Sequence, residues 1–151
     1  MSSLPPCLTD REYAKLLALR VGVRRFLRWS EERAAEVGLT ATQHQLLLAI
    51  RGHSDPRGPT IGELADYLCT RHHSAVQLID RVEHLGLVTR HRGKGRDRRV
   101  VRLTLTTAGE GKLTLLSTLH LQELQRLAPL VMAWAGQASA APNAPVTPAT
   151  P

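Results

Sequence analysis

Nine arginine and lysine residues stand within residues 71–102, against only three acidic residues. The rest of the chain is nearly balanced, so this segment holds almost all of the formal net charge of +7. Cationic groups concentrated in this way are typical of a surface that binds the phosphates of nucleic acid. Charge alone fits a solvated, highly charged loop equally well. The interpretation therefore depends on the elements that position these residues.

A helical pattern covers the first half of this segment. In HSAVQLIDRVEHLG the apolar residues recur at helical spacing and predict one buried stripe, with Gly86 ending the helix. The residues of this stripe are Ala75, Leu78, Ile79, Val82 and Leu85. The opposite face then carries polar side chains of the kinds that read base edges in the major groove. Together with the helix N-terminus, where unpaired amides favour phosphate, these are the predicted DNA contacts of the helix. They are Thr70, Arg71, His72, His73, Ser74, Gln77 and Arg81.

The hydrophobic period changes after Gly86. LVTRHR and RRVVRLTL are short segments rich in Val, Leu and Thr that partly alternate, and the basic stretch GKGRD separates them. This pattern predicts a β-hairpin with a basic tip. Arg96, Arg98 and Arg99 are then expected to reach an adjacent minor groove, whose narrow negative channel attracts arginine.

Four Thr-x-x-Glu or Thr-x-x-Gln motifs predict where the other helices begin. They start at Thr9, Thr40, Thr60 and Thr107. In such a capping box the threonine oxygen accepts the third helical amide, while the Glu or Gln side chain reaches back to the capping amide. The helices predicted from these signals span residues 10–37, 41–52 and 61–68, with a last helix from Thr107 that Pro129 is expected to kink or break.

Composition restricts the class of protein. A chain of 151 residues with 42% hydrophobic and only five aromatic residues suits one domain with a core of Leu, Val, Ile and Ala. No apolar run approaches the roughly 20 residues that span a bilayer, so we expect no membrane partner. The N-terminal residues lack a secretory pattern, and the two cysteines are typical of reduced thiols. These features predict a cytoplasmic protein.

The chain also resembles a known family in four stretches: LTATQHQLLLAI, IGELADYL, HHSAVQLIDRVEHLGLVTR and DRRVVRLTLTTAG. Over about residues 9–134 it is similar to the MarR-type multiple-antibiotic-resistance regulators. The resemblance implies a mainly α fold with a small β-hairpin wing, a winged helix-turn-helix with N- and C-terminal dimerisation helices. It also implies a homodimer that represses at near-palindromic operators in double-stranded DNA and is released by a small-molecule effector.

The resemblance assigns roles to particular residues and regions. Asp97 and Arg99 take the Asp and Arg positions of the family's wing, which makes Arg99 the minor-groove residue and Asp97 the residue that orients nearby arginines. Ser74 and Gln77 fall on the recognition helix. The implied regions are dimerisation helices at 9–38 and 107–134, a DNA-binding lobe at 39–106, and flexible termini at 1–8 and 136–151. The stretch 107–134 departs from the family because it has no break before Pro129, which leaves the half-site spacing open.

Other readings stay open. Cys69, His72 and His73 are metal-ligating types, but no fourth ligand is nearby, so we expect no metal and no other cofactor. Cys7, just before the first helix, is a candidate redox-sensing thiol, since a helix N-terminus can activate a thiolate. A thiol- or metal-responsive regulator on the same fold is therefore one alternative, and a winged-helix module for RNA or protein is another. We find no phosphate loop or nucleophile motif, and expect no enzyme.

Overall fold

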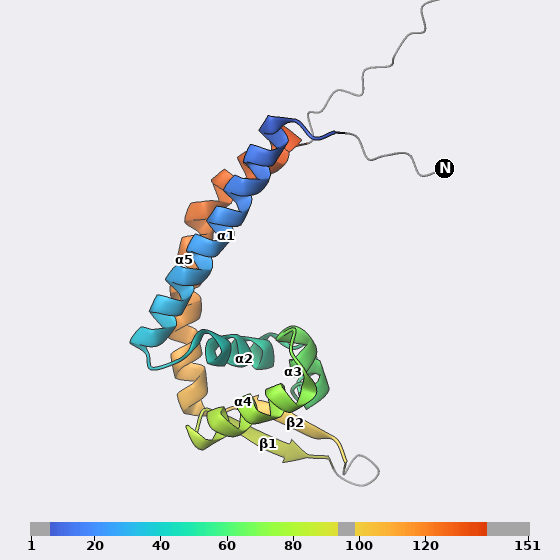
Figure 1. Ribbon diagram of the computed structural model, residues 1–151. Coiled ribbons are helices and arrows are strands. Elements are labelled where there is room, and N and C mark those ends of the chain that lie inside the picture. The colour runs from blue at the N-terminus through green and yellow to red at the C-terminus, as the bar shows by residue number, and fades with distance from the viewer. Residues whose placement is uncertain (1–6, 94–98, 139–151) are drawn as a thin grey trace, which may run out of the picture.

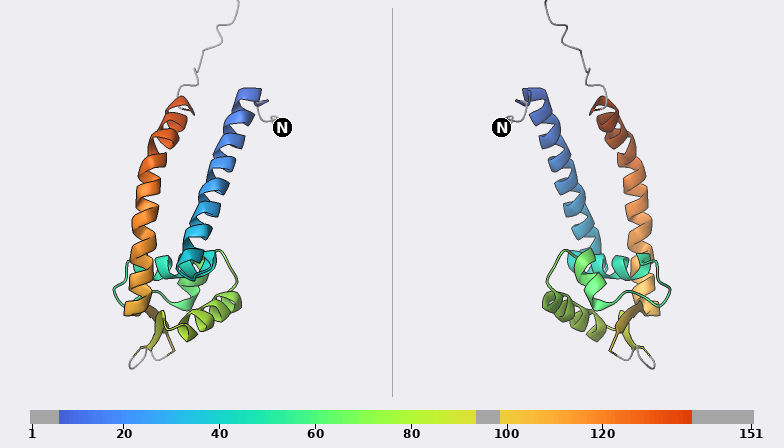
Figure 2. Two further views of the ribbon diagram at one scale, coloured as in Figure 1. Left: turned by 90° about the vertical axis from the view of Figure 1, so that its left-hand side faces the viewer. Right: turned by 90° about the vertical axis from the view of Figure 1, so that its right-hand side faces the viewer.

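The computed structural model describes residues 7–93 and 99–138, and within them the chain forms five helices and a two-stranded antiparallel sheet. In chain order the elements are α1 (Asp10–Glu36), α2 (Ala41–Gly52), α3 (Ile61–Tyr67), α4 (His72–His84), β1 (Val88–Arg92), β2 (Val101–Leu105) and α5 (Thr107–Ala138). Helices α2, α3 and α4 pack with the hairpin into a lobe, while α1 and α5 form an arm that extends away from it (Figure 1). The two arm helices run antiparallel and are spaced apart over most of their length (Figure 2).

Local hydrogen bonding accounts for where the first three helices begin. Thr9, Thr40 and Thr60 each cap a helix, and each forms the reciprocal capping box that its Thr-x-x-Glu or Thr-x-x-Gln motif predicts. A threonine in this position accepts one of the unpaired amides of the first turn. The three start signals are therefore confirmed.

The start of α5 differs from the prediction. Thr106, not Thr107, is the cap, because its Oγ1 accepts the amide of Gly109 at 3.1 Å. The backbone amide of Thr106 also donates to Leu87 O, and its hydroxyl donates to the Gly86 carbonyl at 2.6 Å. These bonds hold Thr106 at the end of the hairpin, so it reaches the capping position first. The expected capping box at Thr107 is wrong.

Helix α5 also runs on past Pro129 to Ala138, so the expected break is wrong. Proline has no amide hydrogen and leaves the carbonyl four residues earlier without its helical partner. That carbonyl belongs to Gln125, and both residues are exposed, so water can take the missing bond. The predicted flexible termini fall mostly on residues 1–6 and 139–151, which lie outside the described residues.

The core lies in the lobe and at the base of the arm. Its fully buried side chains include Leu46, Leu47, Leu64, Ile79, Val82, Leu103 and Leu116. Burying a side chain of this size contributes about 1.5–3 kcal/mol. Along α4, Ala75, Ile79 and Val82 are buried and Leu78 is half-buried, as the predicted stripe requires. Leu85 is exposed instead, because α4 ends at His84 and the chain turns away at Gly86, whose φ is +72°.

The hairpin is joined to the loop before α3. Strands β1 and β2 pair from Val88 opposite Leu105 to Arg92 opposite Val101. On its other side β2 donates the amide of Leu103 to the Pro59 carbonyl at 3.0 Å. Gly58 makes this approach possible, since a Cβ there would overlap the Leu103 carbonyl and its φ of +86° disfavours other residues.

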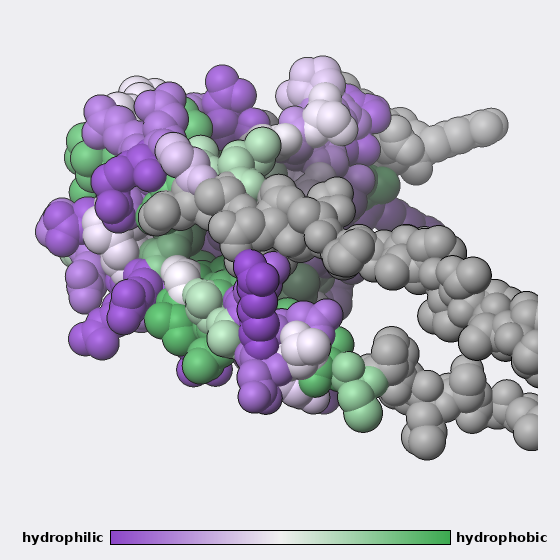
Figure 3. All heavy atoms as spheres, turned by 90° about the horizontal axis from the view of Figure 1, so that it is seen from above, coloured by the Kyte–Doolittle hydropathy of each residue, from purple (hydrophilic) through white to green (hydrophobic). Residues whose placement is uncertain are grey.

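The arm leaves many large apolar side chains exposed. They are Tyr13, Leu16, Leu17, Leu19, Val23 and Leu27 on α1, and Leu115, Leu121, Leu124 and Met132 on α5. Seen from above, apolar side chains reach the surface in groups between polar ones (Figure 3). Many large apolar side chains exposed on one part of a chain usually mark a contact with another molecule. No helix among the described residues has both the length and the apolar character needed to cross a membrane.

Candidate nucleic-acid interface

The N-terminus of α4 is open. Arg71 is its cap residue and makes no side-chain capping bond, unlike the three threonines described above. Arg71, His72 and His73 are exposed there. The first-turn amides and the positive end of the helix dipole therefore face outward beside basic side chains, an arrangement that suits an anion.

The predicted contact residues of α4 lie on one face of the helix. Gln77 and Arg81 are exposed, and the guanidinium of Arg81 donates to the Gln77 carbonyl at 3.3 Å, which lays it along the helix surface. Ser74 is half-buried, so it is less accessible than the predicted pattern requires. Thr70 is exposed in the turn between α3 and α4. Thr70 and Ser74 thus lie beside the open N-terminus, Gln77 lies one turn further along, and Arg81 is in the last turn of the helix.

Arg90 of β1 connects the hairpin to α4. Its guanidinium donates to the Glu83 carboxylate at 2.6 Å and to the Asp80 carboxylate on the same helix. The Arg90 side chain is only 27% exposed. A guanidinium that bridges two carboxylates is positioned in a defined geometry. Arg90 therefore holds the hairpin against α4 and is not available to a phosphate.

Arg102 of β2 is also occupied. It donates to the Gly58 carbonyl at 2.7 Å and lies 3.3 Å from the Asp55 carboxylate. Asp55 also accepts hydrogen bonds from the side chain and backbone of Arg57, which hold the pKa of its carboxyl group well below the usual range. Two of the nine basic residues in segment 71–102, Arg90 and Arg102, thus stabilise the fold. Among the described residues of the segment, four arginines are exposed: Arg71, Arg81, Arg92 and Arg99.

The tip of the hairpin is only partly described. Arg99 is exposed, in a turn just before β2. Arg96, Asp97 and Arg98 lie outside the described residues, so their predicted roles stay predictions.

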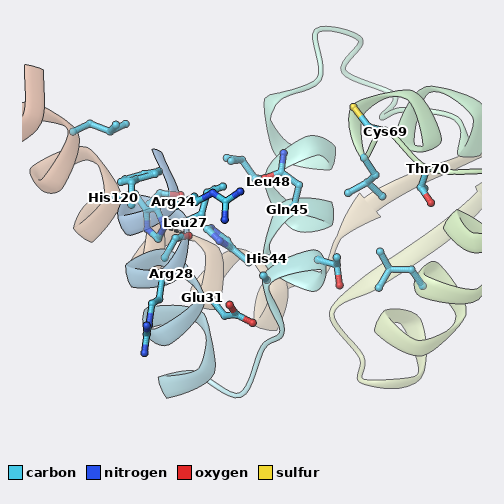
Figure 4. Close-up of a pocket in the computed structure, with 18 of the residues that line it drawn as sticks. Arg24, Leu27, Arg28, Glu31, His44, Gln45, Leu48, Cys69, Thr70 and His120 are labelled. Carbon is cyan, nitrogen blue, oxygen red and sulfur yellow. Dashed lines mark hydrogen bonds between the residues drawn. The ribbon is translucent and has the colours of Figure 1, made fainter. Parts of the chain in front are cut away.

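A cleft opens between the arm and the lobe, with a volume of about 1500 Å³. Its walls come from α1, α2, α4 and α5, and its lining combines apolar side chains such as Leu27 and Leu48 with Arg24, Arg28 and Arg81 (Figure 4). Glu31 is the only carboxylate that lines it among the described residues. The sequence pattern did not reveal this site, since its residues are far apart in the chain.

The described residues contain no group of three or more His, Cys, Asp or Glu residues that could hold a metal ion. Cys7 and Cys69 are both exposed and are not joined in a disulfide. Cys69 adopts a left-handed backbone conformation, with a φ of +49°, at the end of α3.

The helix pair α3–α4 followed at once by the hairpin defines a winged helix-turn-helix protein. Residues 37–99 match the model of the MarR family. A MarR family protein from Bacillus stearothermophilus is 25% identical over 80% of this chain and 82% of its own, with a TM-score of 0.66. The MarR family regulator AbsC from Streptomyces coelicolor is 21% identical over 89% and 97%, with a TM-score of 0.68.

A MepR mutant from Staphylococcus aureus, bound to an oligodeoxyribonucleotide, is 17% identical over 81% of this chain and 84% of its own, with a TM-score of 0.61. No curated protein sequence matches the chain significantly. In its fold and in residues 37–99, which are less than half of its length, the chain is similar to MarR-type winged-helix transcription regulators.

Proposed function

We propose that the chain is a cytoplasmic, sequence-specific repressor that binds double-stranded DNA as a homodimer and is released by a small-molecule effector. The observation that carries this proposal is the α4 surface. An uncapped, basic helix N-terminus continues into an exposed polar face, and Arg90 fixes the basic hairpin beside it. A helix that enters the major groove beside a wing that follows the backbone needs this arrangement.

The contact residues divide by chemistry. Thr70, Arg71, His72 and His73 bind phosphates at the helix N-terminus, which positions the protein without reading the sequence. Ser74, Gln77 and Arg81 read base edges, for which their side chains have suitable donors and acceptors. On the wing, Arg96, Arg98 and Arg99 supply affinity at the minor groove, and Asp97 orients them.

The arm supplies the dimer in this proposal, through residues 9–38 and 107–134. Its exposed apolar side chains cover one another when two copies of the arm meet. A symmetric dimer presents two α4 helices related by a two-fold axis, so the matching operator is near-palindromic.

The cleft is the proposed effector site. Its mixture of apolar side chains and three arginines against one carboxylate suits a lipophilic acid such as a phenolic carboxylate. An effector in the cleft contacts both the arm and the lobe, so it can favour one orientation of the lobe relative to the arm. Coupling of this kind is typically about 1–3 kcal/mol, or roughly 5–150-fold in DNA affinity. Screening lipophilic acids by thermal shift and then by DNA release tests the site.

The DNA-binding proposal is tested with a duplex that the protein selects from a randomised library. Arg99→Ala should weaken binding to all duplexes and flatten the salt dependence of the affinity by about one unit for each phosphate that the arginine no longer neutralises. Gln77→Ala should leave that slope unchanged and relax the preference at one position per half-site, by about 1–3 kcal/mol if the contact is bidentate. Arg51→Ala, on the exposed surface of α2 and outside the proposed contact residues, is the matched control and should change neither.

Three outcomes contradict parts of this proposal. If Arg99→Ala binds with the salt slope of the unaltered chain, the hairpin is not a DNA-contacting wing. If single-stranded RNA competes as well as duplex DNA does, the RNA-binding alternative holds. If oxidant releases the DNA and Cys7→Ser prevents the release, the protein is a thiol sensor and not a ligand sensor.

A further inference from the structure

His44 is the only polar or charged residue that is buried among the described residues, with 6% of its surface exposed. It lies on α2, in the lobe, where this helix contacts both arm helices. Its ring centroid is 4.8 Å from that of His120 on α5. Figure 4 shows the two side chains close together where α1, α2 and α5 meet. Two titratable rings thus form part of the junction between the arm and the lobe.

The hydrogen bonds of His120 can form whether its ring is neutral or protonated. Its Nδ1 is 2.7 Å from the Leu116 carbonyl, which can only accept, so Nδ1 carries a hydrogen. Its Nε2 is 2.6 Å from the Ser30 hydroxyl on α1. A neutral ring accepts the Ser30 hydrogen, whereas a protonated ring donates to the Ser30 oxygen. Rotation of one hydroxyl therefore accommodates a proton on His120.

Aromatic rings of α1 enclose His120. Its centroid is 4.9 Å from that of Trp29 and 5.9 Å from that of Phe26. An aromatic face stabilises a cation that lies against it.

His44 has the opposite environment. Burial lowers the pKa of His44, and the neighbouring His120 lowers it further. The charged groups on the surrounding walls are Arg24, Arg28 and Glu31 of α1, and Arg81 of α4. On α5, the Glu123 carboxylate is paired with Arg126. Positive groups predominate, so a proton added to the pair meets repulsion and incomplete solvation.

We propose that His44 and His120 form a pH-sensitive latch between the arm and the lobe, which packs tightly when both rings are neutral and loosens in mildly acidic solution, lowering DNA affinity. The change in DNA affinity rests on the function proposed above, whereas the loosening of the junction does not. His44 is buried and His120 is half-buried at the contact of three helices, where both line the edge of the cleft. This pair is well placed for the role, because a second charge is poorly hydrated while the helices stay closely packed.

The pH range follows from the direction of the His44 shift. The unfolded chain has a histidine pKa of about 6.5. Because the pKa of His44 is lower in the folded chain, the folded chain binds fewer protons below that pH. The contribution of His44 to stability is complete above about pH 6.5 and is lost progressively as the pH falls below it. Exposed His72 and His73 act on DNA binding with the opposite sign, because their protonation adds positive charge at the proposed interface.

The first experiment follows Trp29 emission in the full chain carrying Trp134→Phe, which leaves Trp29 as the single indole. Between about pH 7.5 and pH 5.5, where histidine titrates, the emission should change. Adding His44→Gln or His44→Phe should reduce this change or shift its midpoint. Two His44 variants are used so that one folded variant suffices. Titration curves that coincide in the parent and a folded His44 variant overturn the latch.

The second experiment measures affinity for a duplex selected by the protein at about pH 7.5. The parent chain should bind about tenfold more weakly at about pH 5.5, which is within the range typical of coupling between two sites, while a His44 variant should lose less affinity or gain some. The control His72→Gln/His73→Gln should lose more affinity than the parent. Equal pH dependence in parent and His44 variant overturns the latch alone. A chain that binds no duplex at any pH overturns the proposed function, and the Trp29 titration still decides the latch.

Discussion

The lobe and the arm contain the same kinds of apolar residue but use them differently. In the lobe, α2, α3, α4 and the hairpin bury their leucines, isoleucines and valines against one another within one chain. In the arm, α1 buries only Ala34 among its 27 residues and exposes six large apolar side chains. The difference teaches that the lobe, with the base of the arm, closes its own core, whereas the rest of the arm leaves its apolar side chains exposed.

Removing core volume from the lobe should have the largest effect. Leu64 on α3 is fully buried, so Leu64→Ala should lower the free energy of unfolding by about 2–5 kcal/mol, through lost burial and the cavity that remains. Leu85→Ala makes the same chemical change at an exposed position of the lobe and should stay within about 0.5 kcal/mol. Urea denaturation measures both, and equal effects would contradict a closed core.

The second-largest effect on stability is expected where the backbone of the hairpin contacts the loop before α3. Gly58→Ala should cost about 2–3 kcal/mol, because a Cβ overlaps the Leu103 carbonyl and the positive φ adds strain. At Gly52, on the last turn of α2, a Cβ meets nothing, so Gly52→Ala should be neutral or stabilising by up to about 1 kcal/mol. If thermal unfolding ranks the two variants in the reverse order, the close packing of the loop is wrong.

A charge on the arm should affect association and not folding of the lobe. Leu17 on α1 is 64% exposed in the single chain. Leu17→Glu should weaken the proposed dimer by about tenfold or more, equivalent to about 1.4 kcal/mol, while Thr42→Glu on exposed lobe surface should not. Sedimentation over a range of concentrations measures the change. A dimer of unaltered affinity would place the interface elsewhere.

The smallest effect is expected at the end of α3. Helices α1 and α4 end in Schellman turns with a glycine in the left-handed position, Gly38 and Gly86, and α3 ends in the same hydrogen-bond pattern with Cys69 there. Cys69→Gly should therefore stabilise the lobe by roughly 0.5–1 kcal/mol. Cys69→Ala removes the thiol but keeps the Cβ, so it should change stability little. A stabilising Cys69→Ala would assign the cost to the thiol instead of the backbone.

Sequence reasoning succeeded where the decisive interactions are local. The capping boxes at Thr9, Thr40 and Thr60 connect residues three apart, and the α4 stripe repeats within one helix. Both signals can be read without knowing the fold. The family resemblance added the overall architecture, which local patterns do not determine.

Sequence reasoning failed where packing brings distant residues together. In the sequence, Arg90 and Arg102 could not be distinguished from the other cations of segment 71–102. In the structure both form ion pairs, Arg90 with carboxylates on α4 and Arg102 with a carboxylate before α3. His44 and His120 are 76 positions apart and meet only because α2 contacts α5. The cap of α5 was misplaced by one residue, since the hairpin positions Thr106 through a tertiary bond to Gly86.

The continuity of α5 has a mechanical consequence. Only Thr106 separates the last residue of β2 from this helix, which then runs without interruption for 32 residues. At 1.5 Å per residue it is about 48 Å long, so a tilt of about 5° moves one end by about 4 Å relative to the other. Near the lobe, the second turn of α5 is attached to the end of α1 by the hydrogen bond from Lys112 to the Val37 carbonyl, so the far end of the helix is the end that can move. In the proposed dimer, a small change in the angle between two such helices would change the distance between the wings by about the rise of one base pair.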